Sequence, residues 1–199
     1  MGHPSDDDLI KYSASMEQIK TRFAAAERFL DAGVVYPNVE SAALQVRLAL
    51  ETLMLSALLP NRDAVESVAA NYAKHKHDRI MKIMRRVNPN FWPKPSTQHY
   101  VAPGEWRLDD FTGDFLREDE YSQAWGRLSA WCHATNPLEP LRDLAGGAEM
   151  IAQTMKRTIN LLNHHNRVLT DPRYQVVCVM HSKQDGRVHT SELEAIGDA

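Results

Sequence analysis

An arginine, a histidine and an asparagine close together near the middle of the chain are the side chains best suited to chemistry. In the stretch WGRLSAWCHATNP (125–137), Arg127 precedes His133 by six positions, and Asn136 follows before a proline. A histidine can move protons between a 2′-hydroxyl group and a leaving oxygen. An arginine can offset the charge of a crowded phosphate. His133, Arg127 and Asn136 are therefore the candidate catalytic group for cleavage of RNA without a metal ion.

A second arginine–histidine pair competes with the first. Arg157 and His164 lie in KRTINLLNHHNR (156–167), where a helical period would place Asn160 and Arg167 on the same face. A polar stripe of this kind is also typical of the solvated side of a helix. Because the chain has 15 arginines and nine histidines, pairs at this spacing arise by chance, and spacing alone does not choose between the two.

A basic stripe is the third candidate, and it would bind a ligand without catalysing a reaction. In AKHKHDRIMKIMRRVN (73–88), His75, Arg79, Lys82 and Arg86 recur at helical spacing. Such a stripe can follow a phosphate backbone, although it is also typical of a solvated helix face. Nothing here predicts a metal site or a cofactor, since the sequence contains no HExxH, no CxxC and no glycine-rich phosphate loop.

Composition indicates an ordinary soluble domain. The chain has 199 residues, 43% of them hydrophobic, and a net charge of −3, so any contact with nucleic acid must come from a local patch. No hydrophobic signal segment opens the chain, and Cys132 and Cys178 match no metal or redox spacing. We therefore expect a cytoplasmic protein that does not enter a membrane.

Hydrophobic periodicity predicts a helical bundle. Helices are expected over about 6–30, 38–59, 63–87, 117–134 and 148–169, with a shorter one over 108–115. The second is apolar on more than one face, which is typical of a central helix, and its Arg47 and Glu51 lie on one face. The proline-rich segment 88–107 has no period and is expected to be a long loop.

The period changes near the C-terminus. Residues 174–180 are rich in β-branched side chains, and the sequence Asp185-Gly186 is a turn signal before a second short strand. Since an isolated hairpin is marginal in water, we expect it to lie on the helices or to pair with a second protomer. The predicted architecture is mainly α: a bundle of about five helices over 5–170, with a C-terminal β-hairpin over 171–199.

Together these motifs resemble a known group of proteins. The order of LQVRLALETLMLSALL (44–59), VNPNFWPKP (87–95), WGRLSAWCHATNPL (125–138), INLLNHH (159–165) and DGRVH (185–189) is similar to that of a group of uncharacterised bacterial proteins. The bundle with its Arg/His pair resembles the HEPN superfamily of small all-α domains. That resemblance implies a homodimer whose two Arg/His pairs form one composite cleft, with Arg127 binding phosphate and His133 acting as acid and base.

Two functional hypotheses follow. The first is a HEPN-like protein that acts on RNA, as a metal-independent endoribonuclease in a stress response or in phage defence. The second is a non-catalytic helical module that dimerises through its hairpin and binds a partner protein or a small anionic ligand. One departure bears on the choice, because Leu128 follows Arg127 where catalytic HEPN members commonly carry a polar residue.

Overall fold

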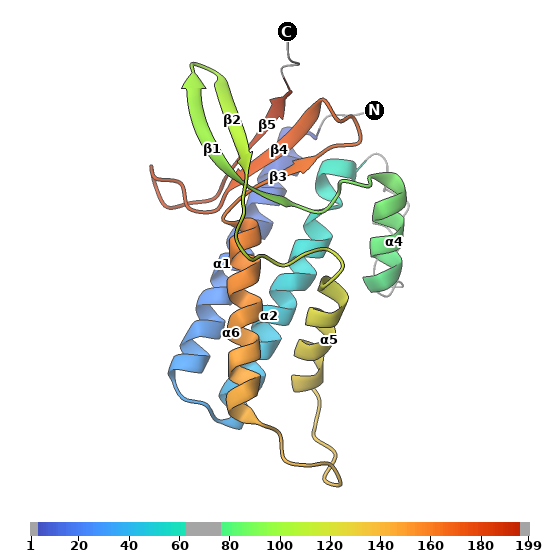
Figure 1. Cartoon of the computed structure of the whole chain (residues 1–199), viewed down its shortest axis with the longest axis vertical. Helices are drawn as coiled ribbons and strands as arrows, with labels where there is room; N and C mark the ends of the chain where they lie inside the picture. The colour runs from blue at the N-terminus through green and yellow to red at the C-terminus, as the bar shows by residue number, and fades with distance from the viewer. Residues whose placement is uncertain (1–3, 63–76, 196–199) are drawn as a thin grey trace.

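The protein combines five α-helices with one five-stranded antiparallel sheet in the part of the chain that the structure describes (Figure 1). The structure is a computed structural model, which describes residues 4–62 and 77–195 and, of the side chains in the latter range, those from residue 80 onward. In chain order the elements are α1 (Asp6–Asp31), α2 (Tyr36–Ser56), a 3-10 turn (Leu59–Asn61), α4 (His77–Val87), β1 (Lys94–Ala102), β2 (Glu105–Asp110), α5 (Tyr121–Trp131), α6 (Leu144–Leu162), β3 (His164–Val168), β4 (Tyr174–Val179) and β5 (His189–Glu194).

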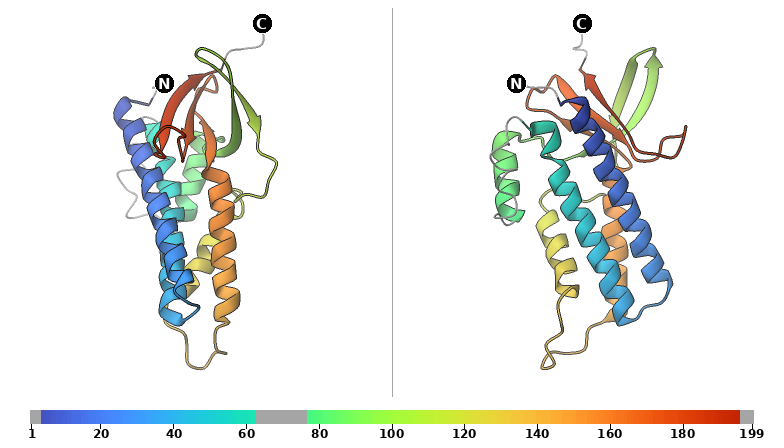
Figure 2. Two further views of the ribbon diagram at one scale, coloured as in Figure 1. Left: turned by 90° about the vertical axis from the view of Figure 1, so that its left-hand side faces the viewer. Right: turned by 180° about the vertical axis from the view of Figure 1, so that it is seen from behind.

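Helix α2 lies at the centre of the bundle, with α1, α5 and α6 packed around it (Figures 1 and 2). By length and composition, the segment Tyr36–Asn61 is apolar enough to cross a membrane. The same composition suits a helix surrounded by others, and residues such as Val46, Leu50 and Leu53 have no exposed surface. The predicted central helix is therefore confirmed, and its apolar faces pack against its neighbours.

Local signals explain how the helices begin. At the start of α1, the Ser5 hydroxyl accepts a hydrogen bond from the Asp8 N–H, and the Asp8 carboxylate accepts one from the Ser5 N–H. This reciprocal arrangement satisfies two backbone donors that the first turn leaves free. At the start of α6, Asp143 accepts a hydrogen bond from the Gly146 N–H. Gly147 in the same turn lies against the Trp131 ring, where any larger side chain would collide. Helix α6 begins at Leu144, whereas the sequence predicted a start at residue 148.

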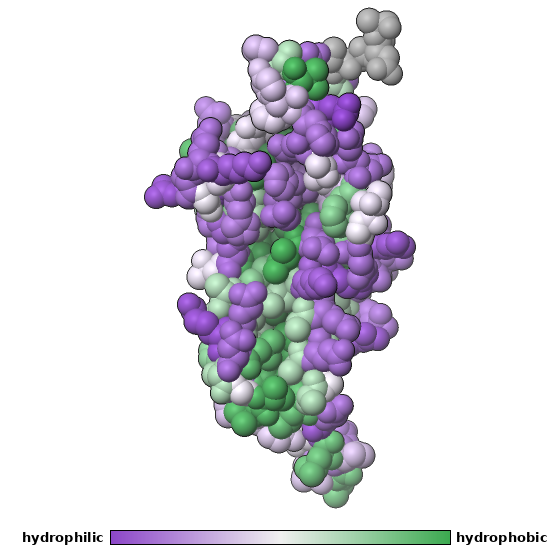
Figure 3. Space-filling model, turned by 60° about the vertical axis from the view of Figure 1, so that its left-hand side comes forward, coloured by the Kyte–Doolittle hydropathy of each residue, from purple (hydrophilic) through white to green (hydrophobic). Residues whose placement is uncertain are grey.

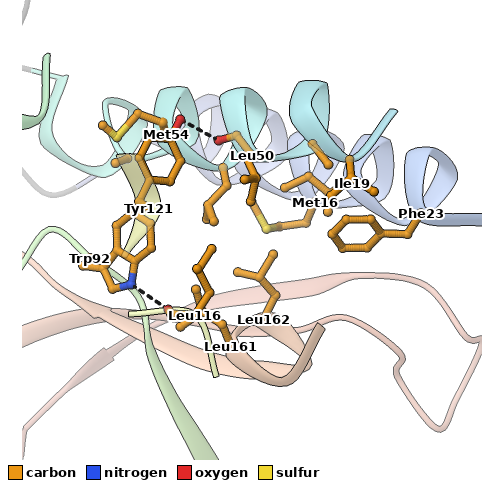
Figure 4. Close-up of a cluster of buried hydrophobic side chains, with 14 of the residues drawn as sticks. Met16, Ile19, Phe23, Leu50, Met54, Trp92, Leu116, Tyr121, Leu161 and Leu162 are labelled. Atoms are coloured by element: carbon orange, nitrogen blue, oxygen red, sulfur yellow. Dashed lines mark hydrogen bonds between the residues drawn. The ribbon is translucent and has the colours of Figure 1, made fainter. Parts of the chain in front are cut away.

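The hydrophobic core lies between α1 and α2 on one side and α6 on the other (Figure 4). Met16, Ile19 and Phe23 from α1 and Leu50 from α2 face side chains from α6. The Tyr121 hydroxyl donates a hydrogen bond to the Leu50 carbonyl over 3.3 Å. These contacts hold α5 and α6 on the bundle while the sheet covers one end of it.

The sheet has the strand order β2-β1-β3-β4-β5 and curls over the end of the bundle (Figure 2). All neighbouring strands are antiparallel. The β1–β2 hairpin turns at Pro103-Gly104, and the β4–β5 connection passes through Asp185-Gly186. Gly104 and Gly186 have φ angles of 80° and 70°, in a region of backbone conformation that favours glycine.

The sheet corrects the prediction of a mainly α protein. The predicted hairpin is present as β4 and β5, but β4 also pairs with β3, so the hairpin belongs to a larger sheet. The segment expected to be a loop, 88–107, contains all of β1 and the start of β2, and 108–115 is not helical. The helix expected over 148–169 ends at Leu162, and β3 follows it. The fold is mixed α and β.

Candidate functional site

Arg127 lies exposed on α5, beside α6. Two contacts from α2 orient the helix: Trp125 donates a hydrogen bond to Glu51 over 3.0 Å, and the Arg47 guanidinium lies over the Trp125 ring. Arg47 also pairs with Glu51 over 3.0 Å, as their shared helix face predicts. Arg127 therefore points away from α2, into a small groove of 80 Å³ that we call the arginine groove. Its lining consists of Leu116, Glu120, Gln123, Ala124, Arg127, Met150, Gln153, Thr154 and Arg157.

His133 and Asn136 lie outside the arginine groove. Helix α5 ends at Trp131, so His133 lies, like Asn136, in the exposed connection to α6, and the predicted extension of the helix to residue 134 is wrong. The His133 carbonyl accepts a hydrogen bond from Arg142. The Asn136 side chain accepts one from the Leu138 N–H over 3.0 Å, which is a turn-forming contact. Within one chain, Arg127 and His133 are not brought to a common pocket among those described.

The competing pair is separated as well. Arg157 lies on α6, where its side chain donates to Asp114, to the Phe115 carbonyl and to Glu120, over 3.0, 2.9 and 2.6 Å. Burial tends to lower the pKa of Arg157, but its bonds to the two carboxylates outweigh burial and raise it. Because these acceptors occupy the guanidinium, Arg157 holds the segment before α5 on α6. His164 is the first residue of β3, and the predicted helical stripe through it is wrong.

The basic stripe is described only in part. His75 lies outside the described residues, and so does the side chain of Arg79. Lys82 and Arg86 are exposed on α4, while Ile80 and Met84 are fully buried, as predicted for the core face. Arg85, between the two exposed cations, pairs with Glu118 and so ties α4 to the segment before α5.

A larger pocket lies between the segment after α4, the base of the β1–β2 hairpin and the segment before α5. It has a volume of 410 Å³ and is lined by residues of 89–95 and 110–118. Three aromatic rings, those of Trp92, Phe111 and Phe115, form its walls, and Lys94 and Arg117 are exposed at its rim. We call it the aromatic pocket. Sequence reasoning had singled out part of it as the motif VNPNFWPKP, but without assigning a site.

The rings of the aromatic pocket are held by their surroundings. Trp92 is 8% exposed, and its indole N–H points to the Leu116 carbonyl at 3.4 Å. Phe111 and Phe115 are half-buried, with ring centroids 6.4 Å apart. The Phe111 ring lies over Gly113, where a β-carbon would come within 2.3 Å of it. Gly113 therefore leaves the space that the ring occupies.

Beneath the sheet, a buried polar network joins α1, α2 and β3. Arg167 is 1% exposed and donates to the Tyr12 hydroxyl over 2.7 Å, to the Phe91 carbonyl over 2.8 Å, and to Leu53 and Ser56 over 3.2 Å each. The last two acceptors lie in the final turn of α2. The negative end of that helix dipole therefore faces the guanidinium.

His165 completes this network. Its Nδ1 atom lies 2.7 Å from the Leu162 carbonyl, which can only accept, so Nδ1 carries the proton. Its Nε2 atom then accepts from the Tyr12 hydroxyl over 2.7 Å. Burial lowers the pKa of His165 to about 3, and it raises the pKa of Tyr12 above its ordinary value. Since none of these groups is open to solvent, we assign the network a structural role.

Two groups of the motif VNPNFWPKP, the Asn88 side chain and the Phe91 carbonyl, also have structural roles. Asn88 is 2% exposed and donates to Asn61 and to the Val168 carbonyl, over 3.0 and 2.8 Å. It thus joins the end of α4 to β3. The Phe91 carbonyl is one of the acceptors of Arg167. The motif VNPNFWPKP therefore both secures the sheet and supplies the wall of the aromatic pocket.

An apolar groove of 280 Å³ lies between α1 and α6. Its apolar lining comes from Phe23, Ala24, Ile159, Leu162 and Met180, and a strip of hydrophobic surface runs down this face between polar ridges (Figure 3). Val34 and Val35 are exposed at the turn between α1 and α2. The described residues include no group of three or more His, Cys, Asp or Glu side chains that could hold a metal ion.

Sequence reasoning missed the aromatic pocket because its residues come from two segments without periodicity. One signal was available: the Pro103-Gly104 pair between two polar, β-rich runs is typical of a hairpin turn. A hairpin over 94–110 would have brought Lys94 near Phe111.

Comparison with known proteins adds no further constraint. A scan against family models, a search of curated proteins and a search of solved structures each find no match to this chain.

Proposed function

We propose that the protein is a binding module for a small anionic ligand with a flat ring, of the nucleotide class. The aromatic pocket is the single observation that carries this proposal. Its volume of 410 Å³ falls within the range of about 300–1,000 Å³ typical of small-molecule sites. Its walls and rim also combine the two chemistries that such a ligand requires.

The walls suit a ring, and the rim suits an anion. Phe111 and Phe115 are only half-buried, so a planar base can pack against them, and stacking of this kind contributes roughly 1–3 kcal/mol per base. Lys94 and Arg117 at the rim are exposed cations, which favour phosphate or carboxylate oxygens. Asp110 and Glu118 line the same pocket, but Glu118 is neutralised by Arg85.

The first prediction concerns Phe111. Replacing Phe111 by alanine removes one stacking wall, and we expect it to weaken nucleotide binding by about fivefold or more. Titration calorimetry with the four ribonucleoside monophosphates measures the effect. Trp106→Ala is the matched control, because Trp106 is an exposed aromatic residue on β2 that packs against Tyr100, outside the pocket. Equal affinities for wild type and Phe111→Ala would contradict the proposal.

A second candidate function is action on RNA by a HEPN-like homodimer, including metal-independent cleavage. Arg127 favours it, since this exposed cation has no carboxylate partner among the described residues and lines a groove with two glutamine side chains. His133 is exposed as well. Because the two do not meet in one chain, a shared cleft would need His133 from a second copy.

The second prediction tests this candidate. If the dimer is a ribonuclease, the purified protein cleaves single-stranded RNA in EDTA, and His133→Ala abolishes cleavage because the proton-transfer group is lost. His189→Ala is the matched control, an exposed histidine that contacts Asp185 instead. Light scattering measures whether the active species is a dimer. Cleavage that survives in His133→Ala would place the chemistry elsewhere.

A further inference from the structure

Three buried polar atoms on the sheet have no hydrogen-bond partner in the described part of the chain. They are Ser96 Oγ, Gln98 Nε2 and His164 Nδ1. Ser96 is only 7% exposed. An unsatisfied buried polar group costs roughly 1–3 kcal/mol, so a cluster of three requires an explanation.

The three side chains share one face of the sheet. Lys94 and Pro95 of β1 pair with Asn166 and His165 of β3, and continuing this antiparallel register by one residue places Ser96 beside His164. His165 points toward the helices, as its contact with Tyr12 shows. Because side chains alternate along a strand, Lys94, Ser96, Gln98 and His164 lie on the opposite face. We call these four residues the sheet cluster.

The sheet cluster adjoins the aromatic pocket. Lys94 belongs to both, and Ser96 pairs in register with Asp110, which also lines the pocket. A ligand whose ring packs against Phe111 and Phe115 therefore has this face of β1 next to it. Asp110 and Lys94 carry opposite charges, so the polar atoms of the cluster act chiefly through hydrogen bonds.

All three unpartnered atoms can donate to an oxygen. A serine hydroxyl and a glutamine amide nitrogen are donors, and a neutral imidazole donates from one of its two nitrogens according to its tautomer. Burial, followed by the nearby Lys183 and His181, lowers the pKa of His164. Three donors of this kind are suited to bind a ligand group that has several acceptor oxygens and no donor.

We propose that the sheet cluster binds the anionic oxygens, of a phosphate or a carboxylate, of the ligand whose ring occupies the aromatic pocket. This inference rests on the function proposed above, and it adds a direction to it. The ring packs against Phe111 and Phe115, and the anionic group extends along β1 over Lys94, Ser96 and Gln98 to His164.

Calorimetry with paired probes tests the inference. Each ribonucleoside is compared with its 5′-monophosphate and with its 5′-carboxylate, using wild type and a triple variant, Ser96→Ala, Gln98→Met and His164→Phe. For wild type we expect the best anionic probe to bind at least about tenfold tighter than its nucleoside, as one or two hydrogen bonds to a charged group imply. For the triple variant we expect this preference to fall to the part that Lys94 and Arg117 at the rim supply, with nucleoside binding unchanged.

Controls separate the two proposals. Thr97→Ala alters an exposed residue on the opposite face of β1, and it should preserve the preference for the anionic probe. A urea titration checks that the triple variant folds, and its stability should match or exceed that of wild type because three unsatisfied groups are removed. If nucleosides bind to wild type but their anionic forms bind no better, the inference fails and the pocket stands. If the preference is undiminished in the triple variant, ordered water alone satisfies the cluster and the inference fails. If no probe binds to wild type, the proposed function itself fails.

Discussion

Replacing Arg167 by alanine is expected to lower the free energy of unfolding by about 4 kcal/mol or more. Arg167 is 1% exposed and makes four hydrogen bonds, to two carbonyls and two hydroxyls. The variant leaves these acceptors without their donor and opens a cavity between α2 and the sheet. Urea unfolding followed by circular dichroism measures the loss.

Two variants sharpen this prediction. Arg173→Ala is the matched control, since Arg173 is exposed and its carboxylate partner is Asp171, two residues earlier in the same connection, so we expect a loss of less than about 1 kcal/mol. Arg167→Lys keeps the charge but lacks the planar fork that reaches several acceptors at once. It should lie between wild type and alanine, and it remains measurable if Arg167→Ala does not fold. Equal stabilities for the alanine variants at 167 and 173 would show that the network contributes little.

Lowering the pH from 7 to 5 is expected to reduce the free energy of unfolding, although carboxylates titrate at lower pH than this. Burial lowers the pKa of His165 to about 3 from an ordinary value of 6.5, so the unfolded chain binds a proton there more readily than the folded one. The stability that neutral His165 provides is complete above pH 6.5 and is lost as the pH falls toward 3. The slope approaches about 1.4 kcal/mol per pH unit for one such group.

Unfolding titrations between pH 7 and pH 5 measure this slope. This window avoids Glu17, Glu120 and Asp185, whose lowered pKa values affect stability only below about pH 5. His165→Gln keeps an acceptor for Tyr12 and does not titrate, so the slope should be smaller in this variant. Adding His164→Asn removes the further contribution of His164, whose pKa burial also lowers, and should leave the stability nearly flat in the window. The same slope in wild type and His165→Gln would contradict the assignment.

The helices show how far periodicity reaches. The expected range 6–30 corresponds to α1 (Asp6–Asp31), and 38–59 corresponds closely to α2 (Tyr36–Ser56). Asp185-Gly186 also lies in the connection between β4 and β5, as predicted. In each case the signal is local: an apolar face at a regular spacing, or a residue suited to a left-handed turn. These signals require no knowledge of what the element packs against.

Strand β3 shows where periodicity fails. Its inward-facing residues are His165 and Arg167, so the alternation of apolar and polar side chains that marks a half-buried strand is missing. A histidine and an arginine are buried here because Tyr12, 153 residues from His165 in sequence, supplies a partner to both. For this reason the sequence pattern of β3 predicted the polar face of a helix.

For the candidate site, the sequence by itself determined which residues could do chemistry, the central helix that carries Arg47 and Glu51, and the presence of a hairpin near the C-terminus. Only the tertiary structure decided which polar residues are buried, which are held in ion pairs and which are exposed. It buries Arg167 and His165, occupies Arg157 with carboxylates, leaves His133 and Arg127 apart, and joins 89–95 to 110–118 around a pocket. The physical reason is that the spacing of apolar residues along the chain shows which face of an element is buried. A polar residue, in contrast, is buried only where a partner distant in sequence forms hydrogen bonds with it.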